Sequence, residues 1–148
     1  MKIVIVSLRV TDQDRALAFY IEKLGFNVNE DMDLGGMRWL TVSPPDQPDL
    51  QVLLEKPGPP FVDDDTAAQI ASLVAKGVGG ALFLAVDDCR GTFDELVAKG
   101  VEVIQEPMER FYGTDCALRD PFGNPLRFTE RPATSATAAG RAAAAPPR

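Results

Sequence analysis

Apolar and polar residues alternate along residues 4–10, and this period of two predicts a β-strand. The spacing of apolar residues then becomes helical from Leu17 to Leu24. Asp12 precedes this segment and suits a helix cap, because its carboxylate can accept hydrogen bonds from the free amides of the first turn. Gly25 follows it and tolerates the left-handed conformation that commonly ends a helix. A strand followed by a capped helix is therefore predicted.

The same pattern returns further along the chain. Residues 82–88 alternate again, Asp88 is a second candidate cap, and a second helical stripe ends at Gly100. The caps Asp12 and Asp88 are 76 residues apart, whereas the two terminating glycines are 75 apart, so the second helix lacks one residue. A repeat of this length indicates a tandem module.

Three strand-like segments separated by turn residues follow each helix. They cover about residues 26–32, 37–43 and 50–55 in the first half, and about 101–106, 114–119 and 125–129 in the second. The predicted turns of the second half are Pro107 to Gly113 and Asp120 to Asn124. Each half therefore has the predicted order β-α-β-β-β, and the fold class is α+β, with mixed β-sheets flanked by helices.

Four segments are expected along the chain. Residues 1–56 form the first module, residues 57–80 a linker with a short helix that begins at an acidic turn, and residues 81–130 the second module. Residues 131–148 are rich in Ala and Pro and lack hydrophobic periodicity, so they cannot offset the entropy of ordering by burial. We predict that this tail is disordered.

Charge and hydropathy narrow the range of partners. The net charge is −7, and because the tail carries three arginines and no acid, residues 1–130 carry −10. Such a body repels nucleic acids and anionic membranes. No apolar stretch approaches the roughly 18 residues of a membrane-spanning helix, and the N-terminus lacks a signal-cleavage pattern. A cytoplasmic protein without nucleic-acid or membrane partners is expected, with Cys89 and Cys116 as buried free thiols.

Several short motifs resemble the vicinal oxygen chelate superfamily, which includes glyoxalase I, bleomycin resistance proteins and extradiol dioxygenases. These motifs are Val10-Thr-Asp12, Ala16-Leu-Ala-Phe-Tyr20, Lys23-Leu-Gly-Phe26 and Arg119-Asp-Pro-Phe-Gly-Asn124. The resemblance covers residues 2–130 and implies two half-cupped sheets that enclose a cavity, often shared across a homodimer. Enzymes of that superfamily hold a divalent metal there with His and Glu side chains.

The metal-binding positions implied by the resemblance carry unsuitable side chains. They are Ile5, Gln51, Ala81 and Arg127. Ile and Ala offer no lone pair, Arg is a permanent cation, and the whole chain contains no histidine. An all-carboxylate site at Asp63 to Asp65 stays open, although an acidic helix start explains these residues as well. We therefore expect no metal and no other cofactor, and the missing ligands disfavour an enzyme without excluding one.

Residues in phase with these positions are expected to line the cavity. The expected ligand-binding set takes six residues from this phase: Ser7, Arg9, Gln51, Leu53, Phe83 and Arg127. It adds Trp39, and also Phe111 and Tyr112, which lie in a loop where the resemblance implies a segment at the rim of the pocket. Trp39 is either a core residue or a stacking wall for a cationic or aromatic ligand. Arg127 either binds an anionic group or pairs with a carboxylate such as Glu55 or Glu130.

The leading hypothesis is a metal-free homodimer that binds or sequesters a small organic molecule. One alternative is a metal-dependent lyase, isomerase or dioxygenase of the same superfamily with non-standard ligands. Another is a structural or protein-interaction module whose cavity is filled by its own side chains.

Overall fold

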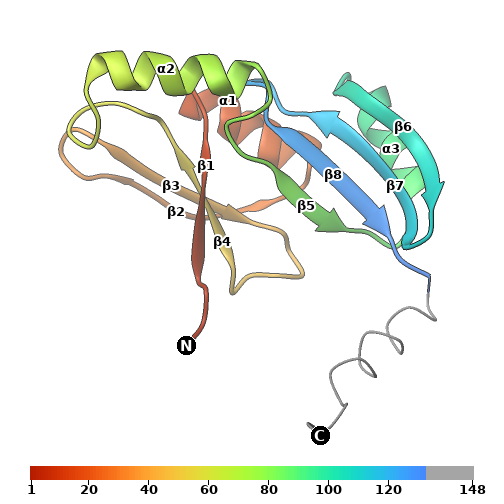
Figure 1. The fold of residues 1–148 in the computed structure, drawn as a ribbon. Helices are drawn as coiled ribbons and strands as arrows, with labels where there is room; N and C mark the ends of the chain where they lie inside the picture. Colours follow the sequence, from red (N-terminus) through yellow and green to blue (C-terminus); the bar gives the residue numbers. More distant parts are fainter. Residues whose placement is uncertain (133–148) are drawn as a thin grey trace, which may run out of the picture. The chain divides into compact units, whose positions relative to one another are not determined.

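The computed structural model describes residues 1–132, and its first four strands form one mixed sheet (Figure 1). The strands are β1 (Ile5–Arg9), β2 (Asn27–Asp33), β3 (Arg38–Ser43) and β4 (Gln51–Glu55), in the spatial order β1-β4-β3-β2. Strands β1 and β4 are parallel, whereas β3 is antiparallel to both β2 and β4. Helix α1 (Gln13–Ala18) contacts β4, and α2 (Asp64–Ala75) contacts β1.

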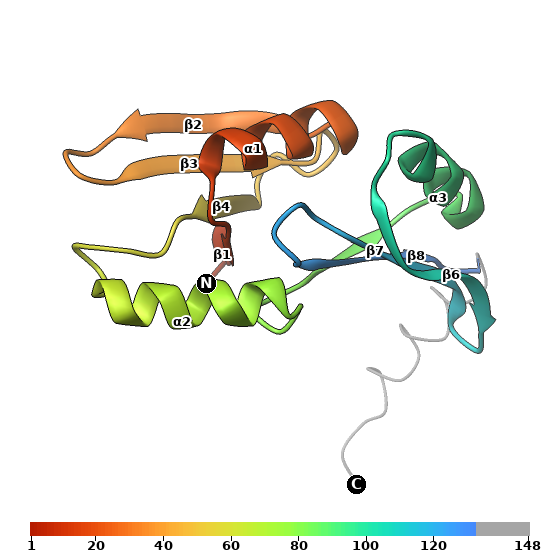
Figure 2. The same ribbon diagram turned by 90° about the horizontal axis from the view of Figure 1, so that it is seen from above.

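The second half repeats this arrangement. Strands β5 (Leu82–Ala85), β6 (Glu102–Arg110), β7 (Gly113–Arg119) and β8 (Pro125–Glu130) have the order β5-β8-β7-β6. Helix α3 (Cys89–Ala98) packs beside β6, as Figure 2 shows. In both sheets the first strand of the module pairs with the fourth, so the predicted α+β fold of tandem βαβββ modules is confirmed.

The predicted caps begin and end the helices. The carboxylates of Asp12, Asp63 and Asp88 each accept a hydrogen bond from the backbone amide three residues later, at 3.0, 2.7 and 2.9 Å. Gly25 and Gly100 adopt φ angles of 73° and 80°, the left-handed conformation that other residues adopt at a cost. Local sequence therefore sets these helix boundaries.

A π-helical turn explains why the first helix is one residue longer than the second. This turn, η1 (Phe19–Lys23), continues α1, and the Leu24 amide donates to the Phe19 carbonyl five residues before it. A turn with this wider spacing accommodates an extra residue without moving the ends of the helix. The two modules therefore keep equivalent caps and glycines despite the difference in length.

The turn predicted from Pro107 to Gly113 is wrong in its extent. Strand β6 continues through Pro107 to Arg110, and only Phe111 and Tyr112 form the turn before β7. Proline removes one backbone donor, which normally interrupts a sheet. Because β6 is an edge strand of its sheet, one of its sides has no partner strand, and a missing donor is tolerated there.

The chain forms two compact units. Unit 1 comprises residues 1–82 together with residues 119–125, and unit 2 comprises residues 83–118 and the chain from residue 126. The core of unit 1 includes Leu8, Val10, Tyr20, Leu40, Val42, Leu54 and Val74. The core of unit 2 includes Cys89, Leu96, Cys116, Leu118, Leu126 and Phe128.

Two further predictions concern the whole chain. Among residues 1–132 no helix is long and apolar enough to cross a membrane. The prediction of a disordered tail falls on residues 133–148, which lie outside the described part of the chain, while Arg131 and Pro132 are exposed and without regular structure.

Candidate functional site

Strand register places the predicted residues of unit 1 on one face of its sheet. Ile5 is the partner of Gln51, and Ser7 is the partner of Leu53. Leu53 in turn pairs with Thr41 of β3, and Trp39 lies two residues before Thr41 on the same side of that strand. Arg9 follows Ser7 on this face. The structure therefore brings five predicted residues of unit 1 onto a single sheet face, which we call the β1–β4 face: Ser7, Arg9, Trp39, Gln51 and Leu53.

Trp39 is half-buried and is held by a specific hydrogen bond. Its indole Nε1 donates to Glu30 Oε2 at 2.8 Å, and across the strand pair it faces Met32. The indole donor is thereby satisfied, while part of the ring remains exposed. Trp39 is thus neither a fully buried core residue nor a free surface side chain.

Two buried polar atoms of the β1–β4 face have no hydrogen-bond partner in the described part of the chain. They are Thr41 Oγ1 and Gln51 Oε1, and the Thr41 residue is fully buried. A buried polar group without a partner is costly and is uncommon in folded proteins. This face therefore retains unused hydrogen-bonding capacity beside Leu53.

Arg9 lies at one end of the same face and forms an ion pair there. Its Nε lies 3.6 Å from Glu55 Oε2, in accord with the register that pairs the two residues. A small hollow beside this pair is lined by Lys56, Pro57, Phe61 and Ile70. The charge of Arg9 is partly neutralised by Glu55, so this guanidinium is a weaker anchor for an anion than an unpaired one.

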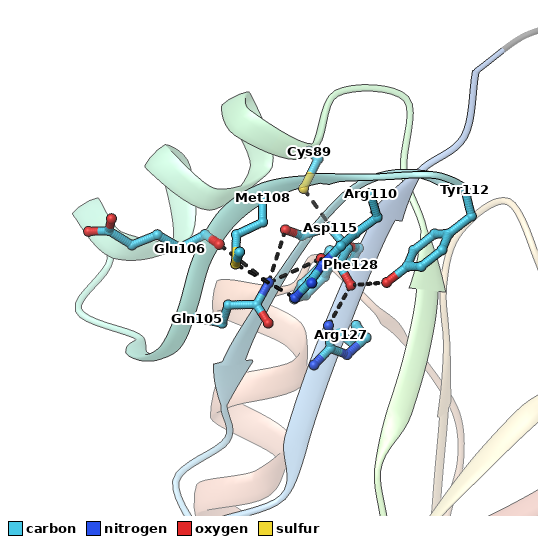
Figure 3. Close-up of polar contacts among 9 residues, drawn as sticks. All are labelled: Cys89, Gln105, Glu106, Met108, Arg110, Tyr112, Asp115, Arg127 and Phe128. Atoms are coloured by element: carbon cyan, nitrogen blue, oxygen red, sulfur yellow. Dashed lines mark hydrogen bonds and ion pairs between the residues drawn. The ribbon is translucent and has the colours of Figure 1, made fainter.

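In unit 2 the predicted residues Tyr112 and Arg127 both contact the buried carboxylate of Asp115 (Figure 3). Asp115 is 0% exposed; one of its oxygens, Oδ2, accepts hydrogen bonds from Tyr112 Oη at 2.7 Å and from Arg127 Nη1. Gln105 Nε2 donates to its other oxygen, Oδ1, at 3.1 Å, and Arg110 Nε lies 3.6 Å from Oδ1. We call these five residues the Asp115 cluster: Gln105, Arg110, Tyr112, Asp115 and Arg127.

The contacts of Asp115 set its ionisation. Burial by itself raises the pKa of this carboxyl, but the hydrogen bonds from Tyr112, Arg127 and Gln105 outweigh that effect. The net result is a pKa below the ordinary value. The hydrogen bond to Asp115 and the burial of its own hydroxyl raise the pKa of Tyr112, so at neutral pH the tyrosine is the proton donor and the aspartate the charged acceptor.

The structure shows the carboxylate pairing that one interpretation of Arg127 predicted, and it leaves the other interpretation open. Its guanidinium pairs with a carboxylate, as one of them required, and the partner is Asp115, not Glu55 or Glu130. Glu130 instead accepts from the Cys89 amide at 2.9 Å, at the start of α3. Arg127 is 33% exposed, so the ion pair does not exclude a further partner.

The two predicted phenylalanines of unit 2 are highly exposed. Phe111 is 100% exposed and makes an edge contact with Tyr112, with ring centroids 5.1 Å apart. Phe83 on β5 is 78% exposed. Neither ring is a core residue, and within residues 1–132 Phe111 alone makes a ring contact with the Asp115 cluster, so the structure does not bring all the predicted residues of unit 2 together.

Sequence reasoning missed Thr41, Glu30, Gln105, Arg110 and Asp115. One signal was present for Asp115, because it is the single acid between Gly113 and Leu118, in a segment that reads as a buried strand. A charge in such a strand is rarely buried without a partner. The other four residues become recognisable only when β2, β3, β6 and β7 are aligned.

The positions at which the superfamily holds its metal do not fit a divalent cation. Ile5 and Ala81 cannot ligate, and Arg127 places a paired guanidinium where relatives have a carboxylate. Within residues 1–132, no group of three or more His, Cys, Asp or Glu side chains is placed to hold a metal ion. Asp63 serves instead as the cap of α2. We derive no chemical step through a metal.

Several known proteins are similar to this chain in sequence or in fold. YurT of Bacillus subtilis (strain 168) is 36% identical over 88% of this chain and 100% of its own length. The crystal structure of UcmS2 is 44% identical, with a TM-score of 0.84 over 88% of this chain and 98% of that one. The structure of TnmS3, an antibiotic binding protein from Streptomyces sp. CB03234, is 26% identical, with a TM-score of 0.71 over 89% and 97%.

The family profile agrees with these similarities and with the repeated βαβββ topology. The profile described as Glyoxalase/Bleomycin resistance protein/Dioxygenase superfamily matches residues 2–128, which is nearly the whole described chain. The chain therefore belongs to the Glyoxalase/Bleomycin resistance protein/Dioxygenase superfamily.

Proposed function

We propose that this protein binds a small organic molecule without the help of a metal and acts by sequestering a drug or metabolite. The observation that carries the proposal is the β1–β4 face, where the family's metal positions hold Ile5 and Gln51 and where Ser7, Arg9 and Trp39 are exposed or half-buried. A ligand on this face can contact these partly exposed side chains, and apolar surface with a few polar groups is typical of small-molecule sites.

The similarity to TnmS3 supports the same function. That protein is an antibiotic binding protein, and this chain shares its fold along almost the full length of both. Fold similarity alone does not establish a function, because one fold hosts many sites. The argument therefore depends on the candidate ligand-binding residues of each unit taken by itself. In unit 1 they are Ser7, Arg9, Trp39, Gln51 and Leu53, and in unit 2 they are Phe83, Phe111, Tyr112 and Arg127.

Trp39 provides a direct assay for ligand binding, because it is the one tryptophan in the chain. Titration of a panel of antibiotics is expected to quench or shift its fluorescence for at least one compound. Thermal stability should rise for the same compound, since a ligand that binds only the folded state stabilises it. The variant Trp39→Phe should lose the fluorescence signal while it keeps the thermal stabilisation. A panel that changes neither signal would contradict the proposal.

Metal independence needs its own test. Protein purified without a histidine tag is expected to contain no stoichiometric transition metal, and Ni²⁺, Zn²⁺ or Fe²⁺ should not raise its melting temperature. A metal that copurifies and stabilises the fold until a chelator removes it would favour the enzymatic alternative instead. A glyoxalase assay of the same preparation would then identify that activity.

We further propose that the protein is a homodimer. Within residues 1–132, β1 and β5 are edge strands of their sheets, and apolar side chains near them are exposed, Ile3 by 72% and Phe83 by 78%. Exposed apolar side chains beside an unpaired strand edge are typical of association surfaces. Light scattering should give twice the 16.0 kDa mass of one chain, and Phe83→Glu should weaken the dimer. A monomer at micromolar concentration would contradict this proposal.

Two other predictions remain open. The division into modules at residues 1–56 and 81–130, with a linker between them, is a proposal about the units that fold together. The cytoplasmic location predicted from the sequence likewise remains a proposal, which fractionation of the native cell would test.

A further inference from the structure

The Asp115 cluster contains more positive than negative charge. Asp115 is its one carboxylate, whereas Arg127 and Arg110 both lie within ion-pair distance of that carboxylate. The excess of one positive charge stands out because residues 1–130 carry a net charge of −10. A local cationic site on an acidic protein favours an anionic group over the cationic ligand that overall charge suggests.

Neighbouring acids do not neutralise this excess. Figure 3 shows the Glu106 carboxylate directed away from Asp115. Glu109 lies 3.8 Å from Arg90, and Glu130 accepts from the amide at the start of α3. The acids that are adjacent in sequence therefore have other partners or directions, and the two guanidiniums keep their excess charge.

Both guanidiniums are partly exposed and retain donors, although Arg110 Nη2 already donates to Met108 Sδ. Within residues 1–132 Arg127 uses Nη1 for Asp115, which leaves Nε and Nη2 of the five-donor fork. The side chains of Arg127 and Arg110 are 33% and 39% exposed. The buried carboxylate holds Arg127 in place and is itself held by Tyr112 and Gln105. A guanidinium fixed in this way loses less entropy when it binds an acid bidentately.

An aromatic surface lies beside these donors. The fully exposed ring of Phe111 contacts Tyr112, whose hydroxyl is bonded to Asp115. The rings of Phe111 and Tyr112, at the turn between β6 and β7, provide flat apolar area close to the Asp115 cluster. The cluster thus combines one anion-recognising element with one ring-recognising element.

We propose that the Asp115 cluster recognises the anionic oxygen of an aromatic acid, through Arg127 and Arg110, with Phe111 and Tyr112 against the ring. This inference rests on the proposed small-molecule function and narrows its ligand class. Asp115 is a positioning residue, because it acts by orienting Arg127 and does not itself touch the ligand.

Three probes with the same naphthalene ring and different charge test the ligand class. They are 2-naphthoate, 2-naphthamide and 2-naphthylmethylammonium, titrated into the full chain by calorimetry. We expect 2-naphthoate to bind about tenfold more tightly than the amide, corresponding to one charge-assisted interaction, and the ammonium compound to bind most weakly. Equal or reversed affinities would overturn the inference, and so would failure of all three to bind at millimolar concentration.

Single-residue variants show which side chains produce the preference for the anionic probe. Arg127→Met should remove the preference for 2-naphthoate over 2-naphthamide, and Arg110→Met should reduce it, while Lys99→Met on α3 leaves it unchanged. Arg110 is the second test because its contact with Asp115 is longer, so its loss perturbs the fold less. Asp115→Asn should lower the ratio of 2-naphthoate to 2-naphthamide affinity, because Arg127 is no longer held in place. A ratio that rises with the added positive charge would show that Asp115 does not act by orienting Arg127. A charge preference that survives both arginine variants would contradict the assignment.

This experiment separates the inference from the proposed function. If an antibiotic binds and shifts Trp39 fluorescence while the naphthalene probes show no preference for the anion, the inference fails and the proposed function stands. If 2-naphthoate binds with the expected preference while Trp39 and the antibiotic panel show no response, the ligand class stands and the proposed sequestration of drugs fails.

Discussion

The Tyr20 hydroxyl donates a hydrogen bond to Asp120 Oδ2 at 2.9 Å, which joins two buried residues 100 positions apart in the sequence. The other oxygen of Asp120 accepts from the backbone amides of residues 122–124 at 2.8–3.0 Å and thereby closes the turn between β7 and β8. Asn124 Nδ2 continues the network to the Arg9 carbonyl at 2.8 Å. This turn belongs to unit 1, so the network secures a segment of the second module within the first unit.

The first prediction concerns this hydrogen bond. Burial, followed by the charge of Asp120 and the hydrogen bond to it, raises the pKa of Tyr20 well above its ordinary value. Tyr20→Phe leaves Asp120 Oδ2 with Asn124 Nδ2 as its remaining side-chain partner, so we expect a loss of about 1–3 kcal/mol in the free energy of unfolding. Urea denaturation measures this loss. The exposed variant Ser7→Ala should change stability by less than about 0.5 kcal/mol, and an equal effect of both variants would contradict the prediction.

The second prediction concerns the response of Asp115 to acid. Its pKa lies below the ordinary value of about 4, so its ionised form stabilises the fold above that pH and the stabilisation is lost as pH falls through the lower, folded-state pKa. The melting temperature of the wild type should therefore fall more steeply than that of Asp115→Asn as the pH is lowered below about 5. Glu106→Gln, on the same sheet, should keep the wild-type profile. Parallel profiles for all three proteins would exclude this role of Asp115.

The third prediction concerns the two thiols. Cys89 and Cys116 are free and buried, and Cys89 Sγ contacts the Phe128 carbonyl at 3.7 Å. Burial raises the pKa of both thiols, that of Cys116 to about 12, so little thiolate forms in the native protein. Ellman's reagent should therefore react with both thiols only after denaturation. Ser7→Cys, with its exposed position, should react at once, and rapid labelling of the native wild type would contradict the burial of these thiols.

The fourth prediction tests the strand register at the former metal positions. Ile5 and Gln51 are partners on parallel strands, so histidines at both positions would lie side by side. Two adjacent imidazoles can share one divalent ion. The double variant Ile5→His/Gln51→His should be stabilised by Ni²⁺ or Zn²⁺ and lose this stabilisation with a chelator. Each single variant serves as a control, and an identical metal response in single and double variants would show that the two side chains do not meet.

Local sequence determined much of the architecture. The caps Asp12 and Asp88 and the glycines Gly25 and Gly100 mark both helices, because cap hydrogen bonds and left-handed glycines involve only neighbouring residues. The repeat of these signals predicted tandem βαβββ modules, and the family motifs with their missing metal ligands were also present in the sequence. The alternation along β1 and β4 further indicated which side chains share a face.

Tertiary structure alone decided which distant polar groups meet. Nothing local indicates that Asp115 would hold Arg127, Tyr112 and Gln105, since these residues come from different strands and the turn between them. The extension of β6 through Pro107 likewise depends on its place at the sheet edge, where a proline is tolerated. Periodicity reports the face of each strand, whereas the neighbours across a sheet are set by strand order and register. The polar cluster is therefore a property of the folded sheet, and the elements that build it are a property of the sequence.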